Sequence, residues 1–323
     1  MERLIIVVPA YNEEESLPKT INVLSELMQG FIKQKRISNE SIILFVNDGS
    51  KDKTWAIINE YDKKNEHVSG INFSRNFGHQ NAIIGGLTAA YDYGDIFITI
   101  DADLQDDVEA MGKMLDARLE GYDIVYGARN VRETDTKFKR WTAETFYSLM
   151  KKIGVEMVPD AADYRLTSRR VVKHLLQFKE RNLFLRGIVP KIGYPSTVVY
   201  YARKERELGE SKYPLRKMLS FAWDGITSFS VAPMHLVLGM GITTTLVSLF
   251  MVIYSVWQYF SGRVIPGWSS LMISIWFIGG VQLIGISVIG EYVGKVFNET
   301  KERPRFIIQD NLMSTEKKID EKE

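Results

Sequence analysis

The 323-residue sequence contains no cysteine, and its formal net charge is only +1. The first absence excludes disulfide bonds, thiolate catalysis and cysteine-ligated zinc, and it suits a cytosolic catalytic part. The low net charge argues against binding of bulk nucleic acid. Two phosphate-binding motifs are also missing, since no G-x-G-x-x-G follows the first apolar run and no G-x-x-x-x-G-K-[ST] occurs. The sequence therefore does not support a dinucleotide oxidoreductase or a P-loop protein.

Charged residues are absent from two long stretches near the C-terminus. Neither 225–262 nor 264–290 contains Asp, Glu, Lys or Arg, and each is longer than the roughly 20 residues that a membrane-spanning helix needs. We therefore predict a hairpin of two transmembrane helices, at about 232–260 and 268–292, within the segment 231–297. Two buried helices of a soluble core are the alternative.

Basic residues precede the first helix of this hairpin and follow the second, whereas the loop that connects the two helices contains only Arg263. The flanking residues are Arg203, Lys204, Arg206, Lys212, Arg216, Lys217, Lys295, Lys301, Arg303 and Arg305. This asymmetry predicts a cell-membrane protein with the catalytic domain and both termini in the cytoplasm. Residues 213–230 show helical spacing of apolar residues, which predicts an amphipathic helix on anionic lipid or, alternatively, a plain core helix. The tail, 298–323, is expected to be mostly disordered.

Residues 1–212 are expected to form the cytoplasmic domain. Short apolar runs at 4–8, 42–46, 68–73 and 96–100 alternate with amphipathic, helix-length segments at 14–28, 53–65, 79–93 and 107–119. Such alternation predicts an α/β domain with a mostly parallel sheet and helices on both faces. Because ligands of such sheets bind beyond the carboxyl ends of the strands, the residues that follow each run are the candidates for a site.

The run that ends at Ile100 is followed by two carboxylates, Asp101 and Asp103. In an extended backbone alternate side chains share a face, so the two carboxylates are expected to point the same way. Two like charges held this close favour a hard divalent cation between them, which indicates a metal-bound phosphate. Taken alone, both residues could equally cap the next helix.

Three further polar blocks follow strand-like runs. They are Pro9-Ala10-Tyr11-Asn12-Glu13, Asn47-Asp48-Gly49-Ser50 and Ser74-Arg75-Asn76-Phe77-Gly78. Each block alone could be a turn, a helix cap or a solvated charge. Together with Asp101-Ala102-Asp103-Leu104-Gln105 they resemble the signature blocks of family-2 inverting glycosyltransferases with the Rossmann-like GT-A fold. More narrowly, the chain resembles the polyprenyl-phosphate glycosyltransferases, which include bactoprenol glucosyltransferases and dolichyl-phosphate mannose synthases, over roughly residues 1–300.

On the donor side, the resemblance implies a nucleotide-sugar site and a divalent metal, Mg²⁺ or Mn²⁺. The nucleotide-sugar positions would be Pro9, Ala10, Tyr11, Glu13, Asp48, Arg75 and Asp101. The metal would lie among Asp101, Asp103 and Gln105. Asp103 would also be a catalytic residue, because the metal that it binds neutralises charge on the departing diphosphate.

On the acceptor side, the resemblance implies a set of residues that contact a lipid phosphate. They would be Arg129, Lys139, Arg140, Arg206, Ser211 and Lys212. Asp163 matches the acidic residue usually given the role of general base. A phosphomonoester is mostly a dianion at cytosolic pH and needs little deprotonation, so Asp163 could instead position Arg165 or the phosphate, or form a structural pair. His79 and His174 are interpreted as structural histidines.

The resemblance implies transfer of a sugar from a nucleotide-sugar, with UDP-glucose favoured, to undecaprenyl phosphate with inversion. The product would be a polyprenyl-phospho-sugar used for cell-wall or surface polysaccharide. UDP-N-acetylglucosamine and GDP-mannose are alternative donors, and a membrane-tethered nucleotide-sugar-binding scaffold is the non-enzyme alternative. Further expected partners are a downstream flippase and other copies of the chain. Glycines in the predicted hairpin would permit close helix contact in a homo-oligomer, with a tetramer among the candidate states.

Overall fold

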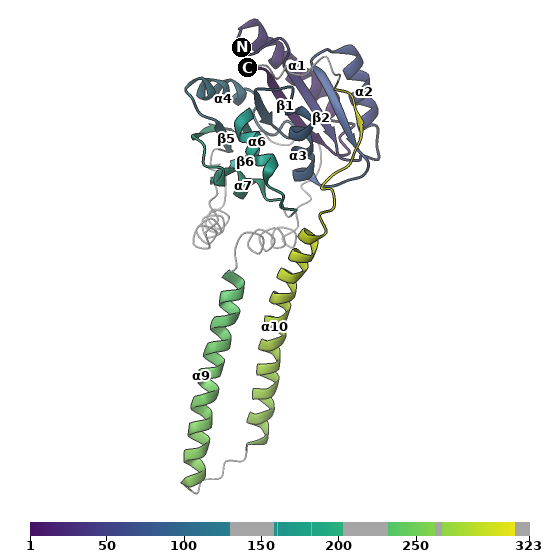
Figure 1. Ribbon diagram of the computed structural model, residues 1–323. Coiled ribbons are helices and arrows are strands. Elements are labelled where there is room, and N and C mark those ends of the chain that lie inside the picture. Colours follow the sequence, from purple (N-terminus) through teal and green to yellow (C-terminus); the bar gives the residue numbers. More distant parts are fainter. Residues whose placement is uncertain (130–157, 160, 182, 203–231, 262–266, 314–323) are drawn as a thin grey trace. The chain divides into compact units, whose positions relative to one another are not determined.

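The computed structural model describes residues 1–129, 158–159, 161–181, 183–202, 232–261 and 267–313 (Figure 1). The chain divides into two compact units. An α/β unit comprises Met1–Lys151, Glu156–Lys212 and Arg303–Glu323, and a helical unit comprises Lys152–Val155 and Tyr213–Glu302. The predicted amphipathic helix at 213–230 lies outside the described residues.

The α/β unit contains a sheet flanked by helices. Its described strands are β1 (Leu4–Ala10), β2 (Ile42–Asn47), β3 (Val68–Phe73), β4 (Ile96–Thr99), β5 (Ile124–Arg129), β6 (Ala161–Ser168), β7 (Ser196–Tyr201) and β8 (Ile308–Asn311). Its described helices are α1 (Leu17–Lys33), α2 (Thr54–Lys64), α3 (His79–Ala90), α4 (Ala110–Leu119), α6 (Arg169–Gln177) and α7 (Leu185–Lys191).

The described strands form one sheet in the order β7-β5-β6-β4-β1-β2-β3-β8. β1 pairs in parallel with both β2 and β4, and β2 pairs in parallel with β3. β6 is antiparallel to its neighbours β4 and β5, and β8 is antiparallel to β3. Because β2 and β4 lie on opposite sides of β1, the strand order reverses there, and ligands bind beyond the carboxyl ends of strands at such a point.

Both faces of the sheet are covered, which explains the continuous apolar runs of its central strands. All seven residues of β1 are buried. Leu4, Ile6 and Val8 belong to the core that includes residues of α1 and α4. On the opposite face, Gly86 of α3 packs against Val7, where an added Cβ would lie 2.4 Å from Val7 Cγ1. Glycine therefore lets α3 lie directly on β1.

The helical unit contains α9 (Ala232–Phe260) and α10 (Trp268–Thr300), drawn side by side and antiparallel in Figure 1. Each includes a segment long and apolar enough to cross a membrane, Pro233–Met251 and Phe277–Thr300. Described apolar side chains such as Leu246, which is 61% exposed, and Leu283, which is 66% exposed, are not buried in a core. The alternative of two buried core helices is therefore wrong, and the expected α/β sheet domain with two apolar C-terminal helices is confirmed.

The C-terminal tail differs from expectation in its described part. Residues 308–311 form β8 and add an antiparallel strand to the edge of the sheet beside β3. Phe306 stacks on Phe73, with ring centroids 5.2 Å apart. The prediction of a mostly disordered tail is thus wrong for 300–313, because Phe306 and the free edge of β3 supply contacts that a composition argument does not see.

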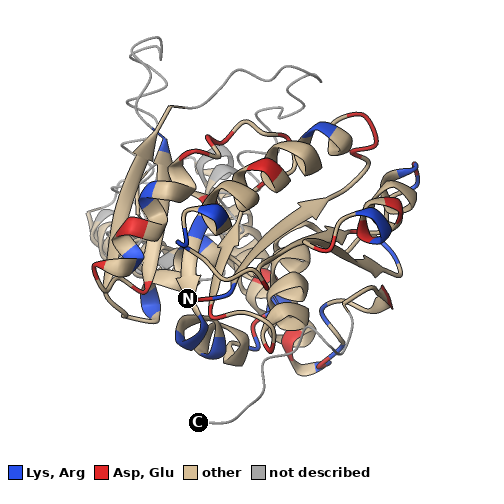
Figure 2. Cartoon of the chain, turned by 90° about the horizontal axis from the view of Figure 1, so that it is seen from above, with Lys and Arg blue, Asp and Glu red and all other residues tan. Residues whose placement is uncertain are grey.

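Charges of both signs are distributed over the helices and loops of the α/β unit (Figure 2). This distribution agrees with the small net charge of the chain.

Candidate active site

The loop after β4 carries the predicted metal-binding carboxylates. β4 ends at Thr99, and the following residues turn rather than continue the strand, with Leu104 at a φ of 52°. The expectation that Asp101 and Asp103 share a face of an extended strand is therefore wrong. The chain leaves the sheet at this point, and the backbone N–H of Gln105 donates to Asp103 Oδ1 at 3.1 Å.

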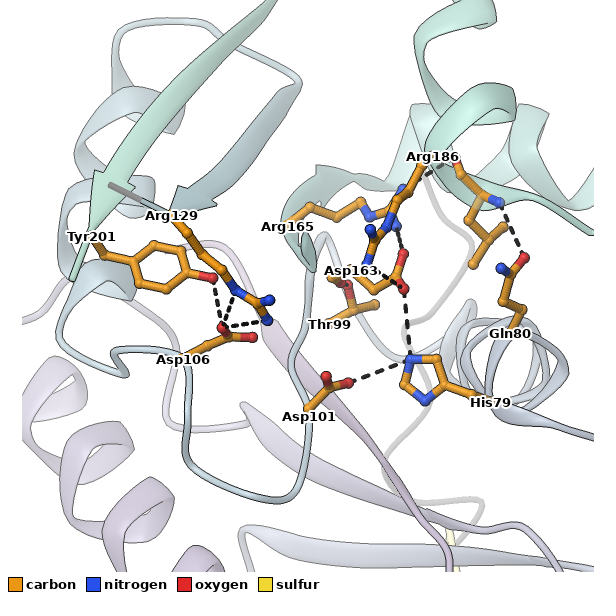
Figure 3. Close-up of polar contacts among 11 residues, drawn as sticks. His79, Gln80, Thr99, Asp101, Asp106, Arg129, Asp163, Arg165, Arg186 and Tyr201 are labelled. Atoms are coloured by element: carbon orange, nitrogen blue, oxygen red, sulfur yellow. Dashed lines mark hydrogen bonds and ion pairs between the residues drawn. The ribbon is translucent and has the colours of Figure 1, made fainter. Parts of the chain in front are cut away.

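His79, the first residue of α3, lies between the carboxylates of Asp101 and Asp163 (Figure 3). Its Nε2 atom is 3.4 Å from Asp101 Oδ1 and 3.7 Å from Asp163 Oδ2. The imidazole thus connects the loop after β4 to strand β6. Sequence reasoning interpreted His79 as structural; its position directly after the Ser74–Gly78 block at the end of β3 was the signal that placed it at the same edge of the sheet.

Asp163 on β6 is held by two arginines. Arg165 Nη2 donates to Asp163 Oδ1 at 2.6 Å, and Arg186 Nη2 lies 3.5 Å from Oδ2. Burial raises the pKa of Asp163, but the guanidiniums of Arg186 and Arg165 together with His79 outweigh it, so the pKa is lower than usual. A carboxylate with a lowered pKa is a weak proton acceptor, which favours a positioning role over general-base catalysis.

Arg186 reaches this carboxylate because α7 is anchored to α3. The backbone N–H of Leu185 donates to Gln80 Oε1 at 3.2 Å, next to His79. No sequence motif marked Arg186, which is 23 residues from Asp163 in the chain. Only the packing of α7 beside α3 and β6 brings its charge to the site.

Asp101 has a pKa raised to about 6. Withdrawal of the carboxylate from water is the main cause, His79 acts in the opposite direction, and neighbouring carboxylates including Asp163 raise the pKa further. A cation bound beside Asp101 would favour the charged form of this carboxylate.

Asp101 and Asp103 are the carboxylates of this loop that would bind a divalent cation, with substrate and water supplying the other oxygens. Among the described residues, no group of three or more His, Asp or Glu side chains forms a closed metal cage. Asp101 and Asp103 provide two carboxylates, and Mg²⁺ typically takes one or two carboxylates plus phosphate and water oxygens. The Gln105 side chain is buried, at 5% exposure, and its backbone N–H contacts Asp103, so its expected place beside the ion stays a prediction.

A second buried cluster holds Arg129 at the end of β5 (Figure 3). Asp106 Oδ1 accepts hydrogen bonds from Arg129 Nη2 at 3.0 Å and from the Tyr201 hydroxyl at 2.7 Å. Asp106 is 2% exposed, and the Arg129 side chain is 31% exposed. Asp106 thus joins the loop after β4 to β5 and β7 and leaves part of the Arg129 guanidinium accessible. Sequence reasoning missed Asp106 and Tyr201, which are 95 residues apart.

The remaining donor-side residues lie on adjacent loops at the same edge. Asp48 is buried, and its two oxygens accept the backbone N–H groups of Phe77 and Gly78 at 2.7 and 2.9 Å. Burial raises the pKa of Asp48, and these two hydrogen bonds oppose that effect. Gly49, with φ +62°, permits the close approach of the two loops, because an added Cβ would lie 2.3 Å from the Arg75 carbonyl carbon.

The loop after β1 is joined to the segment after β2 by hydrogen bonds from its backbone to side chains. The N–H of Asn12 donates to Ser50 Oγ, and the N–H of Glu13 donates to Thr54 Oγ1, both at 2.9 Å. Pro9 and Ala10 end β1 as buried residues, whereas Tyr11 is 43% exposed. The side chain of Tyr11 is therefore available to a ligand.

Arg75 is exposed, and its guanidinium lies 4.0 Å above the ring of Phe77. Five of the expected acceptor residues, Lys139, Arg140, Arg206, Ser211 and Lys212, lie outside the described residues. Of the residues expected on the acceptor side, the structure describes Arg129 and Asp163.

Known proteins resemble this chain over most of its length. An uncharacterized glycosyltransferase of Bacillus subtilis, YkoT, is 48% identical to this chain, and the alignment covers 96% of this chain and 92% of the length of YkoT. The prophage bactoprenol glucosyl transferase homolog of Escherichia coli is 39% identical over 95% of this chain and 98% of its own. The bactoprenol glucosyl transferase of Shigella phage SfX is also 39% identical, over 95% of this chain and 99% of its own.

Among solved structures, glucosyl-3-phosphoglycerate synthase of Mycobacterium tuberculosis, crystallised with Mn²⁺, UDP-glucose and phosphoglyceric acid, aligns with a TM-score of 0.46 at 15% identity. The alignment covers 70% of this chain and 78% of that one. The model of the family described as "Glycosyl transferase family 2" matches residues 5–176, which include the loops after β1 to β4 and Asp163. The chain is a glycosyltransferase that belongs to glycosyl transferase family 2.

Proposed function

We propose that this chain transfers glucose from UDP-glucose to undecaprenyl phosphate with inversion, and so makes a polyprenyl-phospho-glucose for cell-wall or surface polysaccharide. The observation that carries the proposal is the 39% identity to bactoprenol glucosyl transferases over 95% of the chain. The alternative donors, UDP-N-acetylglucosamine and GDP-mannose, belong to the same reaction class. The two apolar helices and the bactoprenol-linked relatives indicate membrane association.

On the donor side, Tyr11, Glu13, Asp48 and Arg75 bind the nucleotide-sugar in this proposal. Asp48 acts through the backbone of 77–78, which it fixes by two hydrogen bonds. Asp101 and Asp103 would hold Mg²⁺ or Mn²⁺, and a bound ion supplies charge neutralisation on the departing diphosphate. His79 lies against Asp101, and in this proposal it limits how the unliganded carboxylate can turn.

On the acceptor side, an oxygen of the lipid phosphate attacks C1 of glucose. The new bond joins that oxygen to C1, while the bond from C1 to the β-phosphate oxygen breaks and UDP departs with the bonding electron pair. Attack opposite the leaving group inverts the anomeric centre. Arg129, oriented by Asp106, would hold the acceptor phosphate, because a guanidinium matches phosphate geometry.

Asp163 takes a positioning role in this mechanism. Its lowered pKa and its pairing with Arg165 and Arg186 suit a carboxylate that orients the guanidiniums near the reacting phosphate. The acceptor phosphate arrives mostly as a dianion, since its second pKa is near 6. The reaction therefore needs no strong base on the protein.

The apolar helices fit a lipid acceptor. Both termini would lie on the cytoplasmic side, because basic residues flank the hairpin. Holding the catalytic unit at the bilayer converts a search in solution into a reaction between neighbours at the headgroup plane. The expected homo-oligomer and downstream flippase remain predictions.

The decisive experiment incubates membranes containing the full chain with undecaprenyl phosphate, a divalent metal and one labelled donor at a time. UDP-glucose, UDP-N-acetylglucosamine and GDP-mannose are compared, and the lipid product is identified by mass spectrometry. We expect a hexosyl product from UDP-glucose that requires metal. Product from another donor only would replace the proposed donor. Donor binding without product from any of them would support the scaffold alternative.

A further inference from the structure

Three polar side chains lie in register across the adjacent strands β2, β3 and β8. Asn47 of β2 is the register partner of Asn72 of β3, and Asn72 is the register partner of Asp310 of β8. Register partners point to the same face of a sheet, so the three side chains meet. Asn72 and Asp310 are 238 residues apart in the chain, and only the pairing of β8 with β3 brings them together.

Hydrogen bonds join these side chains into a polar ladder. Asn72 Nδ2 donates to Asp310 Oδ2 at 2.8 Å, and Asn47 Nδ2 donates to Asn72 Oδ1 at 2.7 Å. Asn47 is 2% exposed and Asn72 is 9% exposed, so loss of a hydrogen-bond partner is costly for either amide. The polar ladder continues into the loop after β2, where the backbone N–H of Ser50 donates to Asn47 Oδ1 at 3.4 Å.

The carboxylate of Asp310 sets the direction of the polar ladder. An ionised carboxylate only accepts hydrogen bonds, whereas an amide has a donating end and an accepting end. Asn72 therefore turns its amino group toward Asp310 and its oxygen toward Asn47. Asn47 then directs its own amino group to Asn72, which leaves its oxygen for the N–H of Ser50. Without an acceptor at position 310 both amides can reverse, and the amino group of Asn47 would then face another donor.

The loop at the end of the polar ladder belongs to the donor side of the candidate site. Ser50 Oγ accepts the backbone N–H of Asn12 in the loop after β1, and Asp48 accepts the backbone N–H groups of Phe77 and Gly78 after β3. Hydrogen bonds therefore connect the polar ladder, through the loop after β2, to the loops after β1 and β3.

We propose that Asp310 is a positioning residue for the nucleotide, because its carboxylate fixes the two amides that hold the loop after β2 in its binding conformation. The inference rests on the proposed function, which assigns these loops to the nucleotide-sugar. β8 follows the apolar helix α10 in the chain but belongs to the α/β unit. The C-terminal segment thus completes the donor side. The acceptor side is independent of the polar ladder, because Arg129 lies on β5, toward the opposite end of the strand order.

Contacts outside the polar ladder also attach β8 to the sheet. The backbone N–H of Leu312 donates to Gly70 O at 2.9 Å, and Phe306 stacks on Phe73 with ring centroids 5.2 Å apart. Asp310 is only half-buried. The strand should therefore remain attached when the carboxylate of Asp310 is removed, and the effect of the carboxylate on nucleotide binding can be measured by itself.

The test measures binding of UDP, GDP and farnesyl phosphate to the full chain in neutral detergent with Mg²⁺, by calorimetry. Asp310→Leu removes the accepting oxygens at similar side-chain size, and Asp310→Ala is a second variant with the same loss. Gln309→Leu is the matched control, because Gln309 is exposed on the same strand and outside the polar ladder.

A swapped pair, Asn72→Asp/Asp310→Asn, tests the direction of the amides. The new carboxylate at position 72 accepts from Asn47 on one side and from the new amide at position 310 on the other. Asn47 therefore keeps its oxygen toward Ser50, although the charge has moved from β8 to β3.

We expect Asp310→Leu and Asp310→Ala to weaken binding of the nucleotide that the wild type prefers by about fivefold, the equivalent of one ordinary hydrogen bond. The swapped pair and Gln309→Leu should bind this nucleotide as the wild type does. The affinity for farnesyl phosphate should be the same in all variants.

Four results would overturn the proposal. Unchanged nucleotide affinity in Asp310→Leu and Asp310→Ala would remove the role of Asp310, and an equal loss in Gln309→Leu would assign the effect to the strand as a whole. A swapped pair as weak as Asp310→Leu would refute amide direction as the cause. A parallel loss of farnesyl phosphate affinity would indicate a change of the whole α/β unit. Failure of the wild type to bind either nucleotide would instead overturn the donor site on which the inference rests.

Discussion

Replacing Asp163 by asparagine should destabilise the protein more than a conservative change normally does. The Arg165 side chain is 4% exposed, and its strongest described contact is the 2.6 Å hydrogen bond to Asp163. Its Nε atom has no hydrogen-bond partner among the described residues. Asparagine keeps an accepting oxygen but removes the charge that compensates the buried guanidinium. Removing one partner of a buried pair costs about 3 to 5 kcal/mol, and the retained oxygen favours the lower end.

The informative comparison is a double variant, Asp163→Asn/Arg165→Met. If the buried guanidinium causes the loss, replacing it by an apolar side chain of similar length should recover stability. In detergent we expect Asp163→Asn to lower the unfolding midpoint by about 6 to 12 °C, from about 2 to 4 °C per kcal/mol, and the double variant to regain at least about 3 °C. The control is Asp92→Asn, whose side chain is 53% exposed and 3.8 Å from Arg169; it should change the midpoint by less than about 2 °C.

The pH dependence gives the same prediction an independent check. The pKa of Asp163 is lowered in the folded protein, so its stabilising contribution is full above the unfolded pKa of about 4 and is lost as pH falls through the folded value. The difference between wild type and Asp163→Asn should therefore be constant from about pH 5 to 8. A double variant less stable than Asp163→Asn, or a difference that grows steeply between pH 6 and 8, would refute the reasoning.

Three further changes test other parts of the site. Asp103→Asn should lower kcat by about a hundredfold or more and raise the metal concentration needed for half-maximal rate; an unchanged metal requirement would contradict its role. Asp106→Asn should raise KM for the lipid acceptor about tenfold by releasing its arginine partner, whereas Tyr201→Phe, which removes one hydrogen bond to the same carboxylate, should cost about 1 kcal/mol of stability and leave that KM unchanged. Gly49→Ala should destabilise the protein by more than the roughly 1 to 2 kcal/mol of left-handed strain, because its added Cβ would also meet the backbone of Arg75. Gly121→Ala is the control, since Gly121 has φ +99° but no atom within 4 Å of an added Cβ, and thermal unfolding measures both variants. Equal losses of stability would show that the close approach at Gly49 has no effect.

Much of the α/β unit was predictable because its strands are buried on both faces. The first four apolar runs agree with β1 to β4 to within two residues at each end. The first helix begins at Leu17 rather than at 14, because the backbone of Glu13 and Glu14 is bound by side chains of Thr54 and Asp52. Such long-range bonds leave no periodic trace in the sequence.

The antiparallel strands were not predictable from periodicity. β6 inserts between β4 and β5, and this position brings Asp163 beside Thr99, whose Oγ1 donates to the Asp163 carbonyl at 2.5 Å. β8 was missed because four residues of mixed polarity form a strand only where the edge of β3 is free to pair. Both depend on neighbours distant in the chain.

By itself, the sequence determined the layered α/β unit, the two apolar helices and the order of the polar blocks, because hydrophobic periodicity and strand-end position are local properties. Tertiary structure alone decided which charges meet. His79 lies between Asp101 and Asp163, Asp106 holds Arg129, and Arg303 and Arg305 join Arg75 around one cavity. These encounters follow from strand order and packing, which bring together residues that are far apart in the chain.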